Sequence, residues 1–263
     1  MRHAIVAGKF YPENKAELKR QLESFLKINK NEKVKAVIVP HAGYFFSGKC
    51  AGKAYSLLPA SENYIILGVN HSGIGQDIAI SLENWETPLG KINNDVKLGR
   101  EILKELGIER DETPHKIEHS IEVQLPFLQV SQKNFKIVPI ILKNYSIELC
   151  KKLAEAIYVS SKNLKRKIIA LASSDFTHSG LNYGMIIDMK IDKQAIDKIL
   201  KFDTESFIEI SEKTSICGAG AIATIIELAK MLGAKKAELL EYYDSSKIMP
   251  SESKVGYASI AFM

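Results

Sequence analysis

The sequence has few cysteines and no long apolar run. Three of its 263 residues are cysteine, an odd number in a chain long enough to build its own hydrophobic core. This count argues against a disulfide framework and favours a reducing compartment, so we expect a cytoplasmic protein. No stretch approaches the roughly 18 uninterrupted apolar residues of a membrane helix, and residues 1–8 hold no apolar segment of signal-peptide length. We therefore expect no association with a membrane.

The chain also lacks a concentration of charge of one sign. Its 36 basic and 31 acidic side chains leave a net charge of +5, and segments such as 15–23 and 97–110 mix both signs. This pattern predicts a solvated mixed surface and no nucleic-acid partner. Because no linker, low-complexity tract or internal repeat divides the sequence, we expect a single domain over residues 1–263.

Short runs rich in Val and Ile alternate with longer segments of helical period, which predicts an α/β fold with a central sheet flanked by helices. Two neighbouring strand candidates have no helix between them, so the sheet should be mixed. The expected strands are 34–39, 64–69, 78–82, 137–142, 167–172, 239–243 and 255–262. The expected helices lie near 18–26, 51–58, 96–106, 149–157 and 216–232.

Three of the expected strands are followed by a histidine: His41, His71 and His178. In an open α/β sheet, ligands bind beyond the carboxyl ends of the strands, where loops and helix N-termini converge. Imidazole is the commonest protein metal ligand, and two rings on separate strands can fix an ion without a local motif. A single such histidine is more often structural, but three at equivalent positions favour a shared site.

Cys217 begins the most apolar segment of the chain, and Thr214 or Ser215 is a plausible N-cap for a helix starting there. A thiol in the first turn faces the positive end of the helix dipole, which lowers its pKa and favours the thiolate that binds metals or attacks carbonyls. Together with His41 and His71, Cys217 is therefore our candidate set of metal ligands.

We do not expect the remaining cysteines and histidines to bind the metal. Cys50 and Cys150 lie among Ala and Leu in helical stripes and should be core residues. His119 sits in a polar cluster and could line the pocket or contact a ligand indirectly, rather than hold the metal. His3 and His115 lack strand context and are expected at the surface.

Asp175 and His178 lie three residues apart after the strand expected at 167–172. The carboxylate could orient the imidazole, or both could face one ligand. A fixed histidine beside a metal-bound substrate could remove a proton from it. Alternatively, Asp175 caps the following turn and has no part in the site.

Seven short motifs spread along the chain match one pattern, and the chain resembles the MEMO family. The motifs are residues 7–12, 40–44, 68–71, 87–90, 118–122, 173–178 and 216–218. The resemblance implies a fold similar to the class III extradiol-type non-haem iron dioxygenases, with a pocket at the corresponding place. It puts His41, His71 and Cys217 on the metal-ligand positions of the family, and Asp175 and His178 on its remaining pocket positions.

The family pattern has a cysteine where those dioxygenases have a carboxylate. A thiolate shifts the preference of a site toward copper(I), zinc or thiolate-ligated iron, so ring-opening activity does not follow from the fold. We expect one transition-metal ion, iron or copper with zinc as the further option, and redox or dioxygenase-like chemistry on a small-molecule or peptide ligand.

Two hypotheses from other classes stay open at this point. One is a metal-free cysteine hydrolase with Cys217 as nucleophile, His178 as base and Asp175 as orienting group. It leaves His41 and His71 without a role. The other is a module that binds a peptide or small acid in the same pocket without any chemistry.

Overall fold

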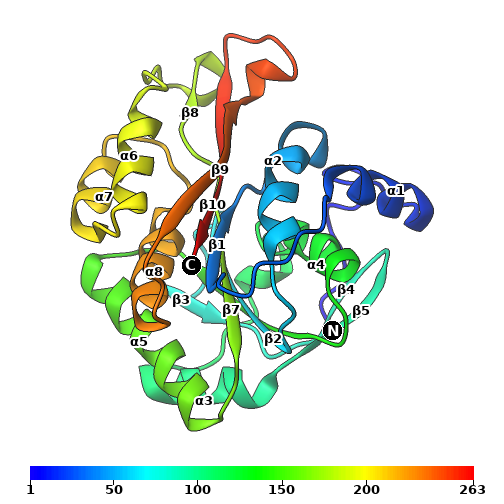
Figure 1. The fold of residues 1–263 in the computed structure, drawn as a ribbon, viewed down its shortest axis with the longest axis vertical. Helices are drawn as coiled ribbons and strands as arrows, with labels where there is room; N and C mark the ends of the chain where they lie inside the picture. Colours follow the sequence, from blue (N-terminus) through cyan, green and yellow to red (C-terminus); the bar gives the residue numbers. More distant parts are fainter.

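A ten-stranded mixed sheet forms the centre of the molecule in the computed structural model, which describes residues 1–263 (Figure 1). The strand order is β4-β5-β6-β2-β7-β1-β10-β8, with β3 also paired to β6 and β9 also paired to β10. The strands are β1 (Ala36–Val39), β2 (Asn63–Val69), β3 (Ile78–Ile80), β4 (Trp85–Thr87), β5 (Gly90–Asn94), β6 (Lys136–Leu142), β7 (Ile168–Ser173), β8 (His178–Ser179), β9 (Ala237–Asp244) and β10 (Lys254–Phe262).

The centre of the sheet is parallel, because β6, β2, β7 and β1 run in the same direction. Every residue of β1, β2 and β7 is buried, which explains the continuous Val, Ile and Leu runs in the sequence. β10 pairs antiparallel with β1, β9 and β8, and β3 pairs antiparallel with β6. The expected α/β class with a mixed sheet is therefore confirmed, whereas similarity to class III dioxygenases stays a prediction.

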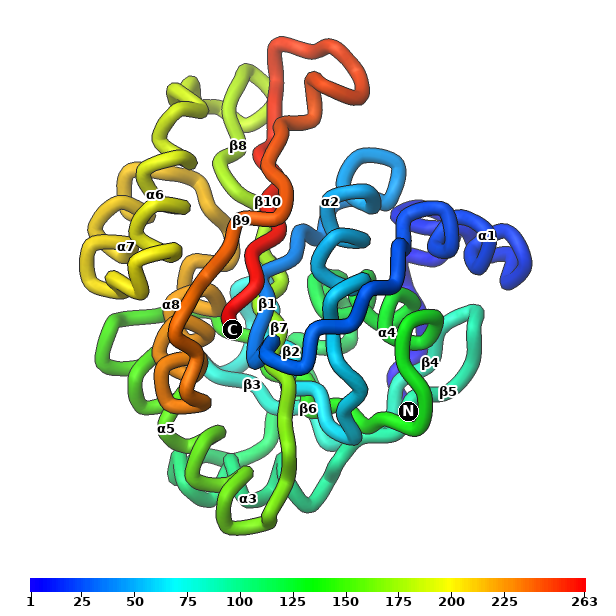
Figure 2. Tube along the Cα trace, in the orientation of Figure 1, coloured from blue at the N-terminus to red at the C-terminus, as the bar shows by residue number.

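Helices cover both faces of this sheet (Figures 1 and 2). One face packs against α3, α5, α6, α7 and α8 in a core of 39 buried residues, and the other packs against α1, α2 and α4 in a core of 27. None of these helices has the length and apolar character that a membrane span requires. They are α1 (Lys15–Phe25), α2 (Tyr44–Leu57), α3 (Val96–Leu106), α4 (Leu125–Ser131), α5 (Ile147–Asn163), α6 (Ile191–Leu200), α7 (Thr204–Ser211) and α8 (Ala219–Met231).

The start of α8 differs from the prediction. The helix begins at Ala219 with Gly218 as its N-cap, so Cys217 precedes the helix and does not lie in its first turn. The expected caps are engaged elsewhere: the Thr214 hydroxyl donates to the carbonyl of Ser211, and the Ser215 hydroxyl donates to the carbonyl of His178. Ser215 therefore ties the segment before α8 to the sheet edge instead of starting a helix.

Candidate metal centre

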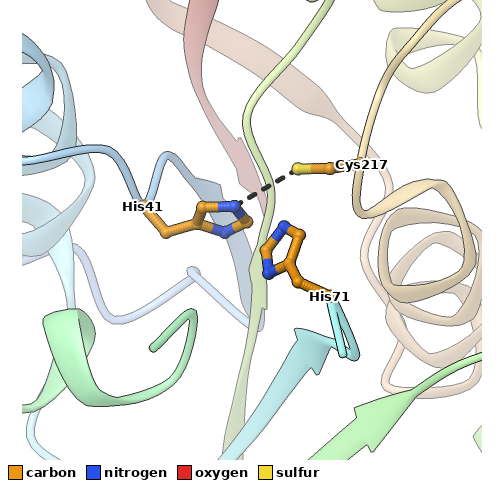
Figure 3. A group of neighbouring side chains, drawn as sticks. All are labelled: His41, His71 and Cys217. Carbon is orange, nitrogen blue, oxygen red and sulfur yellow. Dashed lines mark hydrogen bonds between the residues drawn. The ribbon is translucent and has the colours of Figure 1, made fainter. Parts of the chain in front are cut away.

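Three side chains from distant parts of the sequence meet at the carboxyl end of the parallel strands (Figure 3). His41 lies two residues after β1, His71 lies two residues after β2, and Cys217 lies just before α8. One potential ligand atom from each lies within 4.8 Å of the others, and Nε2 of His41 is 3.2 Å from Sγ of Cys217. Since β7 is the single strand between β1 and β2, the sheet order itself brings the two histidines together.

Buried hydrogen bonds fix the tautomer of His41. The Ser173 hydroxyl donates to the carbonyl of Ser120 at 2.6 Å and accepts from Nε2 of Gln124 at 2.8 Å. Because its one proton is committed to Ser120, Ser173 Oγ can only accept from Nδ1 of His41, at 3.1 Å. His41 therefore carries its proton on Nδ1, and the lone pair of Nε2 faces Cys217. Burial lowers the pKa of His41 to about 3, so this ring is neutral near pH 7.

Glu118 orients the second imidazole. Nδ1 of His71 donates to the Glu118 carboxylate at 3.0 Å, which leaves Nε2 of His71 as the free ring nitrogen. The same carboxylate accepts the backbone N–H groups of His71, His119 and Ser120. Burial alone would raise the pKa of Glu118, but the His71 and backbone hydrogen bonds outweigh it and hold that pKa well below its usual range. A carboxylate behind a histidine in this way is typical of metal ligands.

Cys217 is half-buried, and its sulfur contacts His41 on one side and the backbone carbonyl of Asp175, at 3.5 Å, on the other. Burial raises the pKa of the thiol well above its ordinary value, with the nearby Asp175 carboxylate adding to the effect. The expected lowering by a helix dipole is therefore wrong, because the residue stands outside the helix. Without a cation beside it, this cysteine stays a thiol that donates to Nε2 of His41.

Asp175 and His178 both border the site but do not form a pair. Oδ1 of Asp175 accepts the backbone N–H of His41 at 2.7 Å and of Ala42 at 3.3 Å, so the carboxylate holds the loop that carries His41. Burial raises the pKa of Asp175 against the lowering effect of those N–H groups. His178 instead donates from Nδ1 to the carbonyl of Ser215 at 3.2 Å, so Ser215 orients this ring rather than Asp175.

His119 stacks on His71, with ring centroids 4.9 Å apart and planes 12° from parallel, and touches Phe10 edge to face at 4.7 Å. Burial lowers the pKa of His119 to about 4. Its position as a wall of the site matches the expectation, and with His71 and Glu118 it also forms a second group of possible ligand atoms.

Two expectations about the other residues had opposite outcomes. Cys50 and Cys150 are free and fully buried, as predicted. The surface placement of His115 is wrong, because its ring is 1% exposed, packs edge-on against Trp85 at 5.8 Å and donates from Nε2 to the carbonyl of Ala79. A histidine beside Pro114 in a polar stretch gives no sign of that burial in the sequence.

A cavity of about 390 Å³ opens in front of the cluster. His41, His71, His119, Asp175 and His178 all face it. The rest of its wall comes from the connection between β1 and α2, the loop after β8, the turn between β9 and β10 and Val255 of β10, and from aromatic residues that the sequence analysis missed. These aromatic residues are Phe10, Phe46, Tyr183 and Tyr257.

The cluster fits a transition metal. Two imidazole nitrogens and one sulfur suit iron, copper or zinc, and not calcium or magnesium, which take oxygen ligands. The 3.2 Å between Nε2 of His41 and Sγ of Cys217 is close to the roughly 3.5 Å that separates two ligand atoms on a tetrahedral ion. In both histidines the nitrogen that faces away from the cluster is hydrogen-bonded, as it is in metal-ligating histidines.

The fold and the cluster together define an α/β protein with a candidate metal centre at the carboxyl edge of its sheet. The chain belongs to the Memo-like protein family, whose model matches residues 2–261. It is 39% identical over 264 residues to a MEMO1 family protein of Archaeoglobus fulgidus, covering 100% of this chain and 99% of that protein. It is 41% identical to the relatives in Methanosarcina mazei and Pyrococcus furiosus, each over 99% of this chain and 98% of the relative.

Proposed function

We propose that this protein binds one iron or copper ion through His41, His71 and Cys217 and uses it in redox or oxygen-dependent chemistry on a ligand in the adjoining cavity. One observation carries the proposal. The lone pair of a neutral imidazole and a thiol sulfur meet at 3.2 Å beside a second imidazole, and hydrogen bonds hold both rings in place. The three potential ligand atoms lie within 4.8 Å of one another, so small side-chain movements would bring all of them onto one ion.

A bound iron or copper ion supplies one-electron chemistry and can polarise an oxygen atom of the ligand. The residues around it have separate tasks. Because Nδ1 of His178 donates to Ser215, its Nε2 is free to take a proton from a ligand in the cavity. Asp175 fixes the His41 loop through two backbone N–H groups. Phe10 and Phe46 place apolar walls against the site and limit the access of water.

The geometry does not favour the cysteine hydrolase. The nitrogen beside the Cys217 sulfur belongs to His41, and no hydrogen bond joins His178 to Cys217 or Asp175 to the His178 ring. The thiol also lacks a neighbouring cation that would stabilise a thiolate, and burial raises its pKa. Of the two catalytic hypotheses, we therefore retain the metal-dependent one.

Elemental analysis of protein purified without an affinity tag tests the proposal. Wild type should contain roughly one ion per chain, and the His41→Ala and Cys217→Ser variants should lose most of it. Matched controls are Cys150→Ala, which removes a buried thiol that is not in the proposed ligand set, and His3→Ala, which removes an exposed imidazole. Both controls should keep the ion. Equal metal content in all five proteins would refute the proposal, and zinc as the bound ion would refute its redox part.

A further inference from the structure

The hydroxyl of Tyr257 differs from those of the other buried tyrosines. Tyr257 lies on β10 and is 2% exposed, yet its hydroxyl has no hydrogen-bond partner within the protein. The other five buried tyrosines all donate to a protein oxygen. Those five bonds run from Tyr11 to Glu122, Tyr44 to Val123, Tyr55 to Gln124, Tyr64 to Pro59 and Tyr243 to Phe46.

A buried hydroxyl without a partner is costly, and native proteins rarely leave one unless a ligand or water reaches it. Tyr257 lines the cavity in front of the metal centre, and the fully enclosed polar atoms without partners all lie elsewhere. The hydroxyl is therefore reached from the cavity. Asp175 lines the same cavity, and its Oδ2 likewise has no protein partner, since both backbone N–H groups bond to Oδ1. Tyr257 and Asp175 thus add a free donor and a free acceptor to the cavity, beside the free Nε2 atoms of His71 and His178.

Aromatic side chains restrict what can bind beside these groups. Phe10, Phe46 and Tyr183 line the same cavity and offer flat apolar surface, which suits a ring.

We propose that Tyr257 is a ligand-binding residue, and that its hydroxyl donates to an oxygen or nitrogen acceptor of a ring-bearing ligand in the cavity. This inference deepens the proposed function, on which it rests for the role of the cavity. Tyr257 lies outside the metal-ligand set, however, so metal content and ligand binding can fail separately. The sequence did not point to Tyr257, because this residue stands in a mostly apolar strand run that is typical of core.

The first test compares Tyr257→Phe with Tyr64→Phe, a buried control whose hydroxyl donates to Pro59 at 3.0 Å. Loss of the Tyr64 hydrogen bond should lower Tm by about 2–4 °C. Tyr257→Phe should leave both Tm and metal content at wild-type values, because no bond within the protein is lost. An equal fall in Tm for the two variants would show that the Tyr257 hydroxyl has a structural partner and would overturn the inference.

The second test titrates metal-free protein with benzamide, a neutral ring that carries a carbonyl acceptor, and follows the imidazole NMR signals of the cavity histidines. Benzamide should bind, and Tyr257→Phe should weaken its binding about fivefold, the value of one hydrogen bond. Failure of benzamide to bind, or an unchanged benzamide affinity in Tyr257→Phe, would overturn the inference.

Discussion

Ser173→Ala removes the hydroxyl that dictates the tautomer of His41. In the native protein this hydroxyl gives its proton to the carbonyl of Ser120 and accepts from Gln124 and from Nδ1 of His41. With alanine in its place, Nδ1–H of His41 faces an apolar methyl group. The imidazole is then more stable with its proton on Nε2, because the N–H there can donate a hydrogen bond to the Cys217 sulfur. That tautomer turns an N–H, and not a lone pair, toward the metal centre.

The size of the effect follows from the number of groups that lose a partner. Gln124 keeps its bond to the carbonyl of Pro40, but the Ser120 carbonyl and the Nδ1 atom of His41, with or without a proton, lose the one partner each has. At about 1–3 kcal/mol for each buried unsatisfied group, the variant should be destabilised by roughly 2–6 kcal/mol. Most domains of ordinary stability stay folded after such a loss. Metal affinity should fall about 10–100-fold, as it does when the group that orients a ligating histidine is removed.

Two measurements check this prediction: the ring ¹⁵N shifts of His41 in metal-free protein, which report the tautomer, and a competitive metal titration. Ser160→Ala is the matched control, because Ser160 is also fully buried but its hydroxyl has no partner. That control should keep native stability, tautomer and metal affinity. If Ser173→Ala keeps the proton on Nδ1 and binds metal as tightly as wild type, the reasoning is wrong.

Three further outcomes are expected. Glu118→Gln should weaken metal binding by about tenfold or more in the same titration, because a neutral amide holds Nδ1–H of His71 less strongly than a carboxylate does; unchanged affinity would count against the orienting role. Burial lowers the pKa of His115 from an unfolded value of 6.5 to about 4, so its neutral form stabilises the fold above pH 6.5 and this contribution is lost as pH falls toward 4. The lost stability amounts to about 3 kcal/mol. The free energy of unfolding in urea should therefore depend less on pH between 7 and 4.5 in His115→Gln than in wild type. Parallel pH curves for the two proteins would contradict this. Tyr11→Phe removes the 2.6 Å hydrogen bond to the buried Glu122 carboxylate and should lower the free energy of unfolding in urea by about 1.5–3 kcal/mol. An unchanged free energy of unfolding would contradict a net contribution from that bond.

The sequence predicted those elements whose pattern of apolar residues matches the way the element is buried in the structure. β2 and β7 are buried on both faces and therefore read as unbroken apolar runs. α3 carried both end signals, with the Asp95 side chain accepting from Leu98 and Gly107 adopting a φ of 69°. Short or polar strands such as β4 and β8 give no alternation to detect, since tertiary pairing alone makes them strands.

In the candidate site, too, some residues could be predicted from the sequence and others could not. His41 and His71 could be found because each lies two residues after a buried strand that shows in the sequence, whereas His178 lies five residues after β7 and begins β8. Their hydrogen-bond partners could not, because contacts such as Ser173 with His41 and Glu118 with His71 depend on how strands and loops approach in space. Cys217 was identified for a helix position that it does not occupy, yet its sulfur still reaches the site.

The long separation between His41 and Cys217 has a consequence for refolding experiments. The two residues are 176 positions apart, and their contact requires the β1–β7 pairing and the docking of α8 on the sheet. An unfolded or half-assembled chain cannot hold both at once. An ion that bridges them would therefore bind only the native state and stabilise it by about 2.7 kcal/mol when the free ion concentration is a hundred times Kd. The rate of metal uptake during refolding would then report when the last step of assembly occurs.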